Sequence, residues 1–267
     1  MTILQAAILG LVQGITEFLP VSSTAHLRLV PALLGWPDSG AAFAAVIQLG
    51  TLMAVIGFFL RDLVRMIAAV ARPATRKSID ARMLLYMVAG TVPIGVAGLL
   101  ARHAIEGPLR SILVIASSLI VVGIVMAIVE KTARHERTLD TFTLRDALIV
   151  GMAQALALVP GTSRSGITLV AAMILGFRRD AAARFSFLLS IPAVAAAGVF
   201  ELPKLLHDRE VGTTALATGL LVAGVSGYLS IAWLLRFLRT RTTYGFVVYR
   251  VILGLSLIAA VFGGMSQ

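Results

Sequence analysis

The sequence predicts an all-α, polytopic membrane protein made of two inverted-topology repeats, each a re-entrant helical hairpin followed by three transmembrane helices. Three observations predict this class. Hydrophobic residues make up 58% of the 267 residues and charged residues only 13%, whereas charged residues are about 25% of a soluble chain. Several apolar stretches reach the roughly 20 residues that a membrane-spanning helix needs. Two other apolar regions, which resemble each other, are interrupted by polar segments that contain proline.

Composition and charge exclude several other classes of protein. A net charge of +10 would suit a nucleic-acid-binding protein, but the charged fraction is far too small for one, so we expect no nucleic-acid partner. The high hydrophobic fraction excludes intrinsic disorder. Because the chain has no cysteine, it can form no disulfide, no thiolate metal site and no cysteine nucleophile. The partner that the composition predicts is the lipid bilayer.

Two of the apolar regions differ from simple spans. Ile3–Leu34 is about one and a half spans long and is interrupted at Glu17–Pro20 and Ser22–His26. Ala147–Leu175 is interrupted at Pro160–Ser165. Irregular backbone at membrane depth survives only where protein or a wet cavity covers it, so both regions are predicted to be re-entrant hairpins. The stretches predicted to cross the membrane are Ala41–Leu60, Met83–Ala101, Ile112–Val129, Ala181–Phe200, Leu216–Leu235 and Phe246–Phe262.

Basic residues orient this topology. Sixteen Lys and Arg residues lie on one side of the predicted spans and five on the other, which assigns the richer side to the cytoplasm. Both termini are then outside, and a cytoplasmic loop joins the repeats, about 1–130 and about 146–267, within a single membrane domain, 1–267. Arg164 and Arg250 are not counted, because they lie within or at the edge of apolar segments. The cytoplasmic set is Arg61, Arg65, Arg72, Arg76, Lys77, Arg82, Lys131, Arg134, Arg137, Arg145, Arg178, Arg179, Arg184, Arg236, Arg239 and Arg241, and the outer set is Arg28, Arg102, Arg110, Lys204 and Arg209.

The two interrupted regions match each other in sequence. Gly10–Gln13 corresponds to Gly151–Gln154, and Pro20–Ser23 corresponds to Pro160–Ser163, at offsets of 141 and 140 residues. A near-constant offset indicates a duplication, and three spans per repeat would invert the second repeat relative to the first. Inverted repeats with broken helices place their binding site near the bilayer midplane, where the breaks meet. The alternative is a structural bundle with ordinary kinks.

Polar side chains that are rare in membrane helices gather at the first break. Gln13 and Glu17 are four residues apart, on one face of a helix, and Glu17 is the one acidic residue deep inside an apolar segment. A carboxylate at membrane depth is costly and is a functional candidate by default. After the break, Ser22 or Ser23 is a natural N-cap for a helix. Each hydroxyl is three or four residues from His26, so a serine hydroxyl and the imidazole can face each other.

The second break, Pro160–Thr168, combines small residues, hydroxyls and one arginine. Free backbone N–H groups at a helix N-terminus bind anions well. Arg164 adds a guanidinium suited to two parallel hydrogen bonds with a phosphate. The alternative is an arginine that extends to the membrane surface, which its place between two apolar half-helices disfavours.

Together the two breaks predict phosphoryl chemistry on a substrate that lies in the membrane. Glu17 with Gln13 could hold a hard divalent cation, which prefers oxygen ligands. Arg164 and two helix N-termini could bind phosphate oxygens, and a Ser–His pair could supply a nucleophile and a base. Inverted repeats with broken helices also occur in transporters. A transporter or lipid flippase is therefore one alternative, and a structural membrane scaffold is another.

Gln13-Gly-Ile-Thr-Glu17 followed by Phe-Leu-Pro-Val-Ser-Ser-Thr-Ala-His26 resembles one signature of the bacterial undecaprenyl-diphosphatase family, which is linked to bacitracin resistance. Pro160-Gly-Thr-Ser-Arg-Ser-Gly-Ile-Thr168 resembles the other, and Ile47-Gln-Leu-Gly-Thr51 is also similar to that family. The resemblance covers essentially the whole chain. It implies a membrane phosphatase that hydrolyses undecaprenyl diphosphate to undecaprenyl phosphate and inorganic phosphate, with Mg²⁺ or Ca²⁺, at the outer face of the bacterial inner membrane. This reaction recycles the carrier lipid for peptidoglycan synthesis.

The resemblance also implies roles for individual residues. Glu17 would be a catalytic carboxylate and, with Gln13, a metal ligand; the family admits Gln or Glu at position 13, and the neutral amide here implies weaker metal binding. Ser23 would be the nucleophile and His26 its base, although attack by water, with Glu17 or His26 as base, fits the residues equally well. Arg164 would be catalytic too. Phosphate binding would fall to Ser22, Ser163, Arg164, Ser165 and Thr168.

Three further expectations concern relatives, partners and function. Lipid phosphatases with a phosphohistidine nucleophile are excluded, because their Ser-Arg-x5-His pattern would need histidine where Val170 stands. The glycine-rich segment Gly219–Gly227 allows close helix contacts, either within the chain or in a homodimer. A transporter or flippase of a polyprenyl phosphate lipid is the alternative function.

Overall fold

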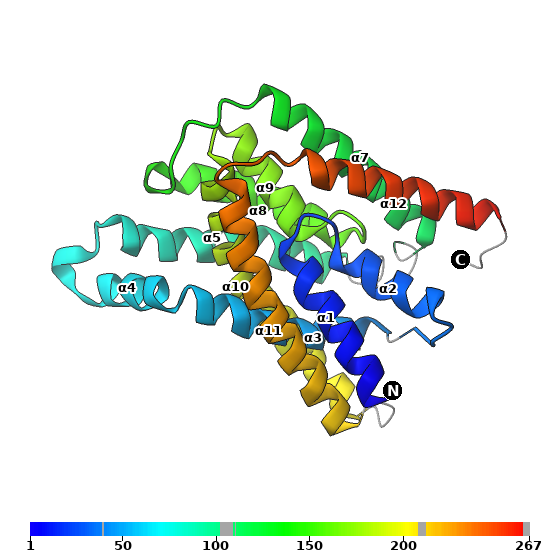
Figure 1. Ribbon diagram of the computed structural model, residues 1–267. Helices are drawn as coiled ribbons and strands as arrows, with labels where there is room; N and C mark the ends of the chain where they lie inside the picture. The colour runs from blue at the N-terminus through cyan, green and yellow to red at the C-terminus, as the bar shows by residue number, and fades with distance from the viewer. Residues whose placement is uncertain (39, 102–108, 110, 208–211, 264–267) are drawn as a thin grey trace.

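The computed structural model describes residues 1–38, 40–101, 109, 111–207 and 212–263, whose helices Figure 1 labels. Short 3₁₀ segments, η1 (Pro73–Thr75), η3 (Leu139–Thr141) and η4 (Leu156–Leu158), lie between the longer helices. The α-helices are α1 (Ile3–Phe18), α2 (Ser23–Leu33), α3 (Gly40–Phe58), α4 (Leu60–Ala71), α5 (Ile79–Leu100), α7 (Ile112–Thr132), α8 (Leu144–Ala155), α9 (Arg164–Ile174), α10 (Arg179–His207), α11 (Thr213–Leu238) and α12 (Tyr244–Phe262).

The predicted all-α, polytopic membrane class is confirmed. Within the described residues, α5, α7, α10, α11 and α12 are long and apolar enough to cross a membrane, and the bent pair of α3 and α4 gives a possible sixth crossing. The one β-feature of this part of the chain is an isolated bridge between Arg137 and Phe177. Each predicted span overlaps one of these helices. In Figure 1, α1 begins and α12 ends on the same side of the molecule, opposite the connection of α4 to α5.

One predicted span is shorter than expected. The predicted span is Ala41–Leu60, but α3 ends at Phe58 and the chain bends by 72° into α4. Leu60, Val64 and Ile67 lie on one exposed apolar face of α4. An apolar face flanked by arginines is typical of a helix that lies in the membrane interface. The spacing of Leu60, Val64 and Ile67, four and then three residues apart, is the signal in the sequence for this helix.

Each interrupted region forms two short helices joined by a sharp turn, as expected for a re-entrant hairpin. Helices α2 and α9 both have 11 residues, which gives each a length of about 16 Å, half the thickness of the hydrocarbon core. Ser22 caps α2 and Ser163 caps α9, each accepting a hydrogen bond on its hydroxyl from the backbone N–H three residues on. Both caps have a positive φ, 73° and 68°, a conformation that costs a serine about 1–3 kcal/mol.

Helix packing relates the two halves of the chain. α1 packs along α11, α8 packs along α5, and α3 lies between α10 and α11 (Figure 1). Glycine allows both hairpin contacts: a Cβ at Gly10 would lie 2.5 Å from the carbonyl oxygen of Gly219, and one at Gly151 would lie 2.2 Å from that of Gly90. The equivalent helices α1 and α8 thus each pack against a span of the opposite half. The inverted repeat itself stays a prediction.

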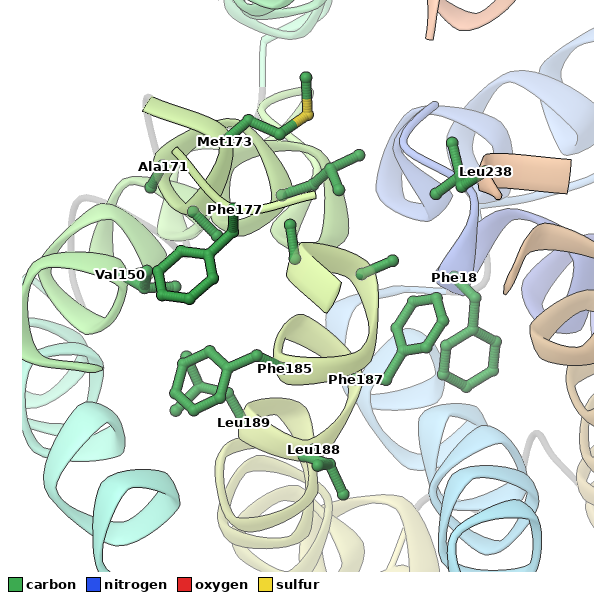
Figure 2. Close-up of a cluster of buried hydrophobic side chains, with 14 of the residues drawn as sticks. Phe18, Val150, Ala171, Met173, Phe177, Phe185, Phe187, Leu188, Leu189 and Leu238 are labelled. Carbon is green, nitrogen blue, oxygen red and sulfur yellow. The ribbon is translucent and has the colours of Figure 1, made fainter. Parts of the chain in front are cut away.

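Aromatic side chains fill the core between the hairpins and α10. Figure 2 shows Phe18 facing Phe187, and their ring centroids are 5.2 Å apart. On the other side of α10, Phe142 stacks between Phe177 and Phe185, with centroids at 4.2 and 4.0 Å. These fully buried rings fix α10 against both hairpins, so the turns between α1 and α2 and between α8 and α9 are held at set positions.

The glycine-rich segment of α11 is used within the chain. A Cβ at Gly219 would approach Ala6, one at Gly224 would approach Gly50, and one at Gly227 would approach Phe18 and Ala54. These glycines bring α11 against α1 and α3, so they give no argument for a homodimer, which stays a prediction.

Of the outer basic set, Arg102, Arg110 and Arg209 lie outside the described residues.

Ion pairs fasten the end of the molecule that carries the predicted cytoplasmic set. Arg137 donates to both carboxylate oxygens of Asp146, at 3.0 and 2.7 Å, and lies over the ring of Phe177. Arg179 donates to Glu130, which also accepts from Thr243. Arg184 and Arg65 both donate to Asp62, so four basic side chains of the richer side are part of the fold as well as of its orientation.

A substitution of Asp146 can test its ion pair with Arg137. Burial raises the pKa of the Asp146 carboxyl, but hydrogen bonds from Arg137 and Thr143 lower this pKa by a larger amount. The pKa therefore lies below its ordinary value. Such a group stabilises the fold above the ordinary aspartate pKa of about 4, and the stabilisation is lost as the pH falls through the folded-state pKa. We expect Asp146→Asn to lower the free energy of unfolding in detergent by about 1–3 kcal/mol near neutral pH.

The difference between the two proteins should shrink as the pH is taken below about 4. Thermal unfolding followed by circular dichroism measures it, with the exposed Asp140→Asn as the matched control. A difference that stays constant with pH would contradict the role given to the ionised Asp146.

Candidate active site

The turns of the two hairpins meet at a cavity of about 270 Å³. Glu17, Ser22 and Ser23 line it from the first hairpin, and Ser163 and Arg164 line it from the second. Thr24 and Gln48 add two more polar side chains, and the rest of the lining is apolar and comes mostly from small residues of α3, α10 and η4, among them Ala44, Ala45, Ala157, Ala193 and Ala197. The cavity therefore has a polar end, where the predicted site residues gather, and an apolar remainder suited to a hydrocarbon chain.

Glu17 is the centre of the hydrogen bonds at the polar end. Its Oε1 accepts from Nη2 of Arg164 at 2.8 Å. Its Oε2 accepts from Oγ of Ser23 at 2.8 Å and from Nε2 of Gln13 at 2.7 Å. The Glu17 side chain is 5% exposed and that of Arg164 is 12% exposed. The ion pair of Glu17 and Arg164 joins the two hairpins. The hydrogen bond from Gln13 to Glu17 confirms that these two residues share a helix face.

Several buried polar atoms of the hairpins have no hydrogen-bond partner in the described part of the chain. They are Nη1 of Arg164, Oε1 of Gln13, and both amide atoms of Gln154, the residue that corresponds to Gln13 in the second hairpin. An unsatisfied buried polar atom is costly, so such atoms are expected where a ligand or water binds. Arg164 can therefore pair with Glu17 and still offer Nη1 to an anion.

The donors present fit a hard cation that is shared with a substrate. Glu17 offers a carboxylate, Gln13 an unpaired amide oxygen and Ser23 a hydroxyl, all of them oxygen ligands of the kind that Mg²⁺ and Ca²⁺ prefer. The described residues contain no cluster of three or more His, Cys, Asp or Glu side chains. A cation here would therefore keep water or substrate oxygens among its ligands, as Mg²⁺ usually does.

His26 has different partners from those we expected. Its Nδ1 lies 2.7 Å from the backbone carbonyl oxygen of Ser22, and its Nε2 lies 2.5 Å from the hydroxyl of Tyr249 on α12. The Ser23 hydroxyl points instead to Glu17. The serine–imidazole contact that the spacing allows is thus replaced by a serine–carboxylate contact, and Ser22, the residue before this serine, has a positive φ.

The predicted phosphate-binding residues separate into two groups. Ser22, Ser163 and Arg164 line the cavity. Ser165 donates to the carbonyl oxygen of Leu19, 3.0 Å away, and so ties the second turn to the first. Thr168 is fully buried, donates to the carbonyl oxygen of Arg164 at 2.7 Å and contacts Ser186. The hydroxyls of the second group stabilise the turns, and their role towards phosphate stays a prediction.

Arg250 is the residue that sequence reasoning missed. It is fully buried, and its guanidinium bonds the carbonyl oxygens of both turns: Pro20 at 3.1 Å and Gly161 and Thr162 at 3.1 Å each. Two more bonds reach Ser118 and Leu119 of α7. The available signal was that Arg250 is the one charged residue inside the apolar segment Phe246–Phe262.

Comparison with known proteins gives a consistent set of relatives. A family model described as bacitracin resistance protein BacA matches residues 6–256. A protein named undecaprenyl-diphosphatase from Myxococcus xanthus (strain DK1622) is 53% identical over 97% of this chain and 89% of its own length. Proteins of the same name are 46% identical in Nocardioides sp. (strain ATCC BAA-499 / JS614), over 98% of this chain and 97% of their own, and 48% identical in Synechococcus elongatus, over 98% and 94%.

The contacts of Arg250 give a test of how the two turns are held. Arg250→Lys keeps the charge but not the planar fork that reaches several carbonyls at once. We expect it to lower the free energy of unfolding in detergent by about 2–4 kcal/mol, since buried carbonyls lose charged donors. Arg241→Lys, at an exposed position before α12, is the matched control. Equal thermal unfolding of the two variants would show that the turns do not depend on Arg250.

Proposed function

Because the chain belongs to the bacitracin resistance protein BacA family, we propose that it hydrolyses undecaprenyl diphosphate to undecaprenyl phosphate and inorganic phosphate. The observation that carries the proposal is the buried pair of Glu17 and Arg164, which joins the two hairpin turns beside a serine hydroxyl in a cavity between membrane helices. The names of the relatives favour hydrolysis over transport of the lipid. The alternative, a flippase, would need no nucleophile beside the carboxylate.

Arg164 and the helix N-termini would bind the diphosphate. Nη1 of Arg164 has no partner among the described residues, and the N-termini of α2 and α9 both begin at the cavity, at Ser22 and Ser163. Free N–H groups and the helix dipole favour an anion at such an end. Positioning and charge stabilisation of this kind supply most of the catalysis in phosphoryl transfer.

Ser23 would attack the terminal phosphorus while Glu17 takes its proton, since the hydroxyl already donates to Oε2 of Glu17 at 2.8 Å. The bond from Oγ to phosphorus forms, and the bond from phosphorus to the bridging oxygen breaks, releasing undecaprenyl phosphate. Water then hydrolyses the phosphoserine and releases inorganic phosphate. Direct attack by water, with Glu17 as base, is the alternative pathway that the same contacts allow.

A divalent cation, Mg²⁺ or Ca²⁺, would be held by Glu17 and Oε1 of Gln13 and would offset the negative charge of the diphosphate. Because Gln13 offers only a neutral oxygen, we propose that oxygen atoms of the substrate supply much of the binding of the cation. The groups of the chain that bind phosphate directly are then Arg164 and the N-termini of α2 and α9.

We propose that the cavity opens to the outer face of the bacterial inner membrane, with both termini outside. Support comes from the basic residues, sixteen of which lie on the opposite side of the predicted topology. The apolar walls of the cavity suit the first part of the prenyl chain, while the rest lies in the bilayer. The reaction would return the carrier lipid to peptidoglycan synthesis, and a homodimer is compatible with this arrangement.

Phosphate release by purified protein in detergent tests the function, because transport cannot be measured without two compartments. We expect turnover of undecaprenyl diphosphate that falls on addition of EDTA. Glu17→Gln and Arg164→Lys should each lower kcat by about 10²-fold or more, since each removes charge or bidentate contact from the transition state. The exposed Arg145→Lys, on the same hairpin as Arg164, is the matched control. Wild-type protein without phosphate release would rule the function out.

A phosphoenzyme trap tests the nucleophile. With substrate labelled at the terminal phosphate and an acid quench, wild-type protein should carry label, because phosphoserine is stable in acid. Ser23→Ala should carry none and turn over about 10²–10⁴-fold more slowly. Ser22→Ala keeps the Ser23 hydroxyl and should still be labelled. Rapid turnover by Ser23→Ala without label would assign the attack to water.

A further inference from the structure

Tyr249 and His26 form a contact between α12 and the first hairpin that the proposed reaction does not use. The Tyr249 hydroxyl lies 2.5 Å from Nε2 of His26, and the two rings lie parallel, with centroids 5.7 Å apart and an angle of 6° between their planes. His26 is 8% exposed. Neither residue is among those that line the cavity of Glu17 and Arg164.

The partners of His26 determine which of its nitrogens carries the proton. The carbonyl oxygen of Ser22, 2.7 Å from Nδ1, can only accept, so Nδ1 must donate to it. In the neutral ring Nε2 then carries the lone pair and accepts from the Tyr249 hydroxyl. Both nitrogens are therefore occupied, and no lone pair is left for the proton of the Ser23 hydroxyl, which donates to Glu17.

The same contacts hold the strained start of α2. Ser22 has a φ of 73°, a conformation that persists only where the surroundings fix it. His26 holds the carbonyl of Ser22, and Arg250, the neighbour of Tyr249 on α12, holds the carbonyl of Pro20 at 3.1 Å. The residue that follows this turn is Ser23, whose hydroxyl must stay 2.8 Å from Glu17 to be activated.

We propose that Tyr249 and His26 are positioning residues: Tyr249 fixes the ring of His26, which holds the Ser22 carbonyl and so keeps the Ser23 hydroxyl on Glu17. The proposal rests on the proposed phosphatase function and deepens it, since it assigns the base to Glu17 and leaves His26 no part in proton transfer. Tyr249 acts from α12, more than 220 residues away along the chain, so the C-terminal span sets the geometry of the N-terminal hairpin.

Two substitutions of His26 separate a positioning residue from a base. In His26→Asn the amide nitrogen can take the place of Nδ1 and donate to the Ser22 carbonyl, but the side chain cannot accept a proton at neutral pH. We expect His26→Asn to keep kcat within about tenfold of wild type and His26→Ala to lose clearly more. Loss of a general base would instead cost both variants about 10²–10⁴-fold. A loss of 10²-fold or more in His26→Asn would overturn the proposal.

Tyr249→Phe removes only the hydroxyl and keeps the stacked ring. We expect kcat to fall about three- to tenfold with KM unchanged within about twofold, because the contact acts on the reacting hydroxyl of Ser23, whereas Arg164 and the N-terminus of α9 still hold the substrate. Tyr244→Phe, on the same helix and exposed, is the matched control and should leave both constants unchanged. An unchanged kcat in Tyr249→Phe, or a change confined to KM, would overturn the role of Tyr249.

The double variant His26→Asn, Tyr249→Phe tests the coupling without depending on the alanine variant. Since the shorter amide no longer reaches the Tyr249 hydroxyl, the second substitution should lower kcat by less than about twofold in that background. A further drop as large as in the wild-type background would contradict the coupling. All variants are compared with wild-type protein that releases phosphate; wild-type protein without activity would instead contradict the proposed function.

Discussion

The structure depends on satisfying backbone polar groups at two helix breaks that lie at membrane depth. Hydrocarbon offers no hydrogen bonds, so each carbonyl and N–H group freed by a break must find a partner within the protein. Arg250 binds the carbonyls of Pro20, Gly161 and Thr162, and so serves both breaks with one guanidinium. Ser22 and Ser163 cap the helices that follow. Without these contacts neither hairpin could turn inside the membrane.

The polar groups at the cavity are those that the contacts of Arg250 do not occupy. The carbonyls of the turns are held by Arg250 on the side of α7 and α12, so the N-termini of α2 and α9 face the cavity, where Ser22 and Ser163 lie. Glu17 and Arg164 then neutralise each other across the cavity at 2.8 Å, which lets both charges exist at membrane depth without substrate. Among the described residues, Nη1 of Arg164 has no hydrogen-bond partner. A phosphate can therefore bind to this nitrogen while Arg164 stays paired with Glu17.

Much of this could be predicted from the sequence, because apolar length and rare polar residues are local signals. The spans, both hairpins, an N-cap at Ser22 or Ser23 and the closeness of Gln13 to Glu17 all follow from local sequence patterns. What could not be predicted depends on which distant helix packs beside a turn. The partner of His26 is Tyr249, which lies at the far end of the sequence. Ser23 donates to Glu17 and follows Ser22, whose φ is positive, and spacing alone cannot show a backbone angle.

The charges near the turns favour an anion in the cavity. Glu17 cancels the charge of Arg164, whereas Arg250 is surrounded by carbonyl dipoles and has no carboxylate partner among the described residues. Carbonyl oxygens stabilise a cation without removing its net charge, so the positive potential of Arg250 persists in a medium of low dielectric constant. The two turns that it holds both present helix N-termini to the cavity, and these add to the same sign of potential. The contact that holds both breaks therefore also favours an anion at the cavity.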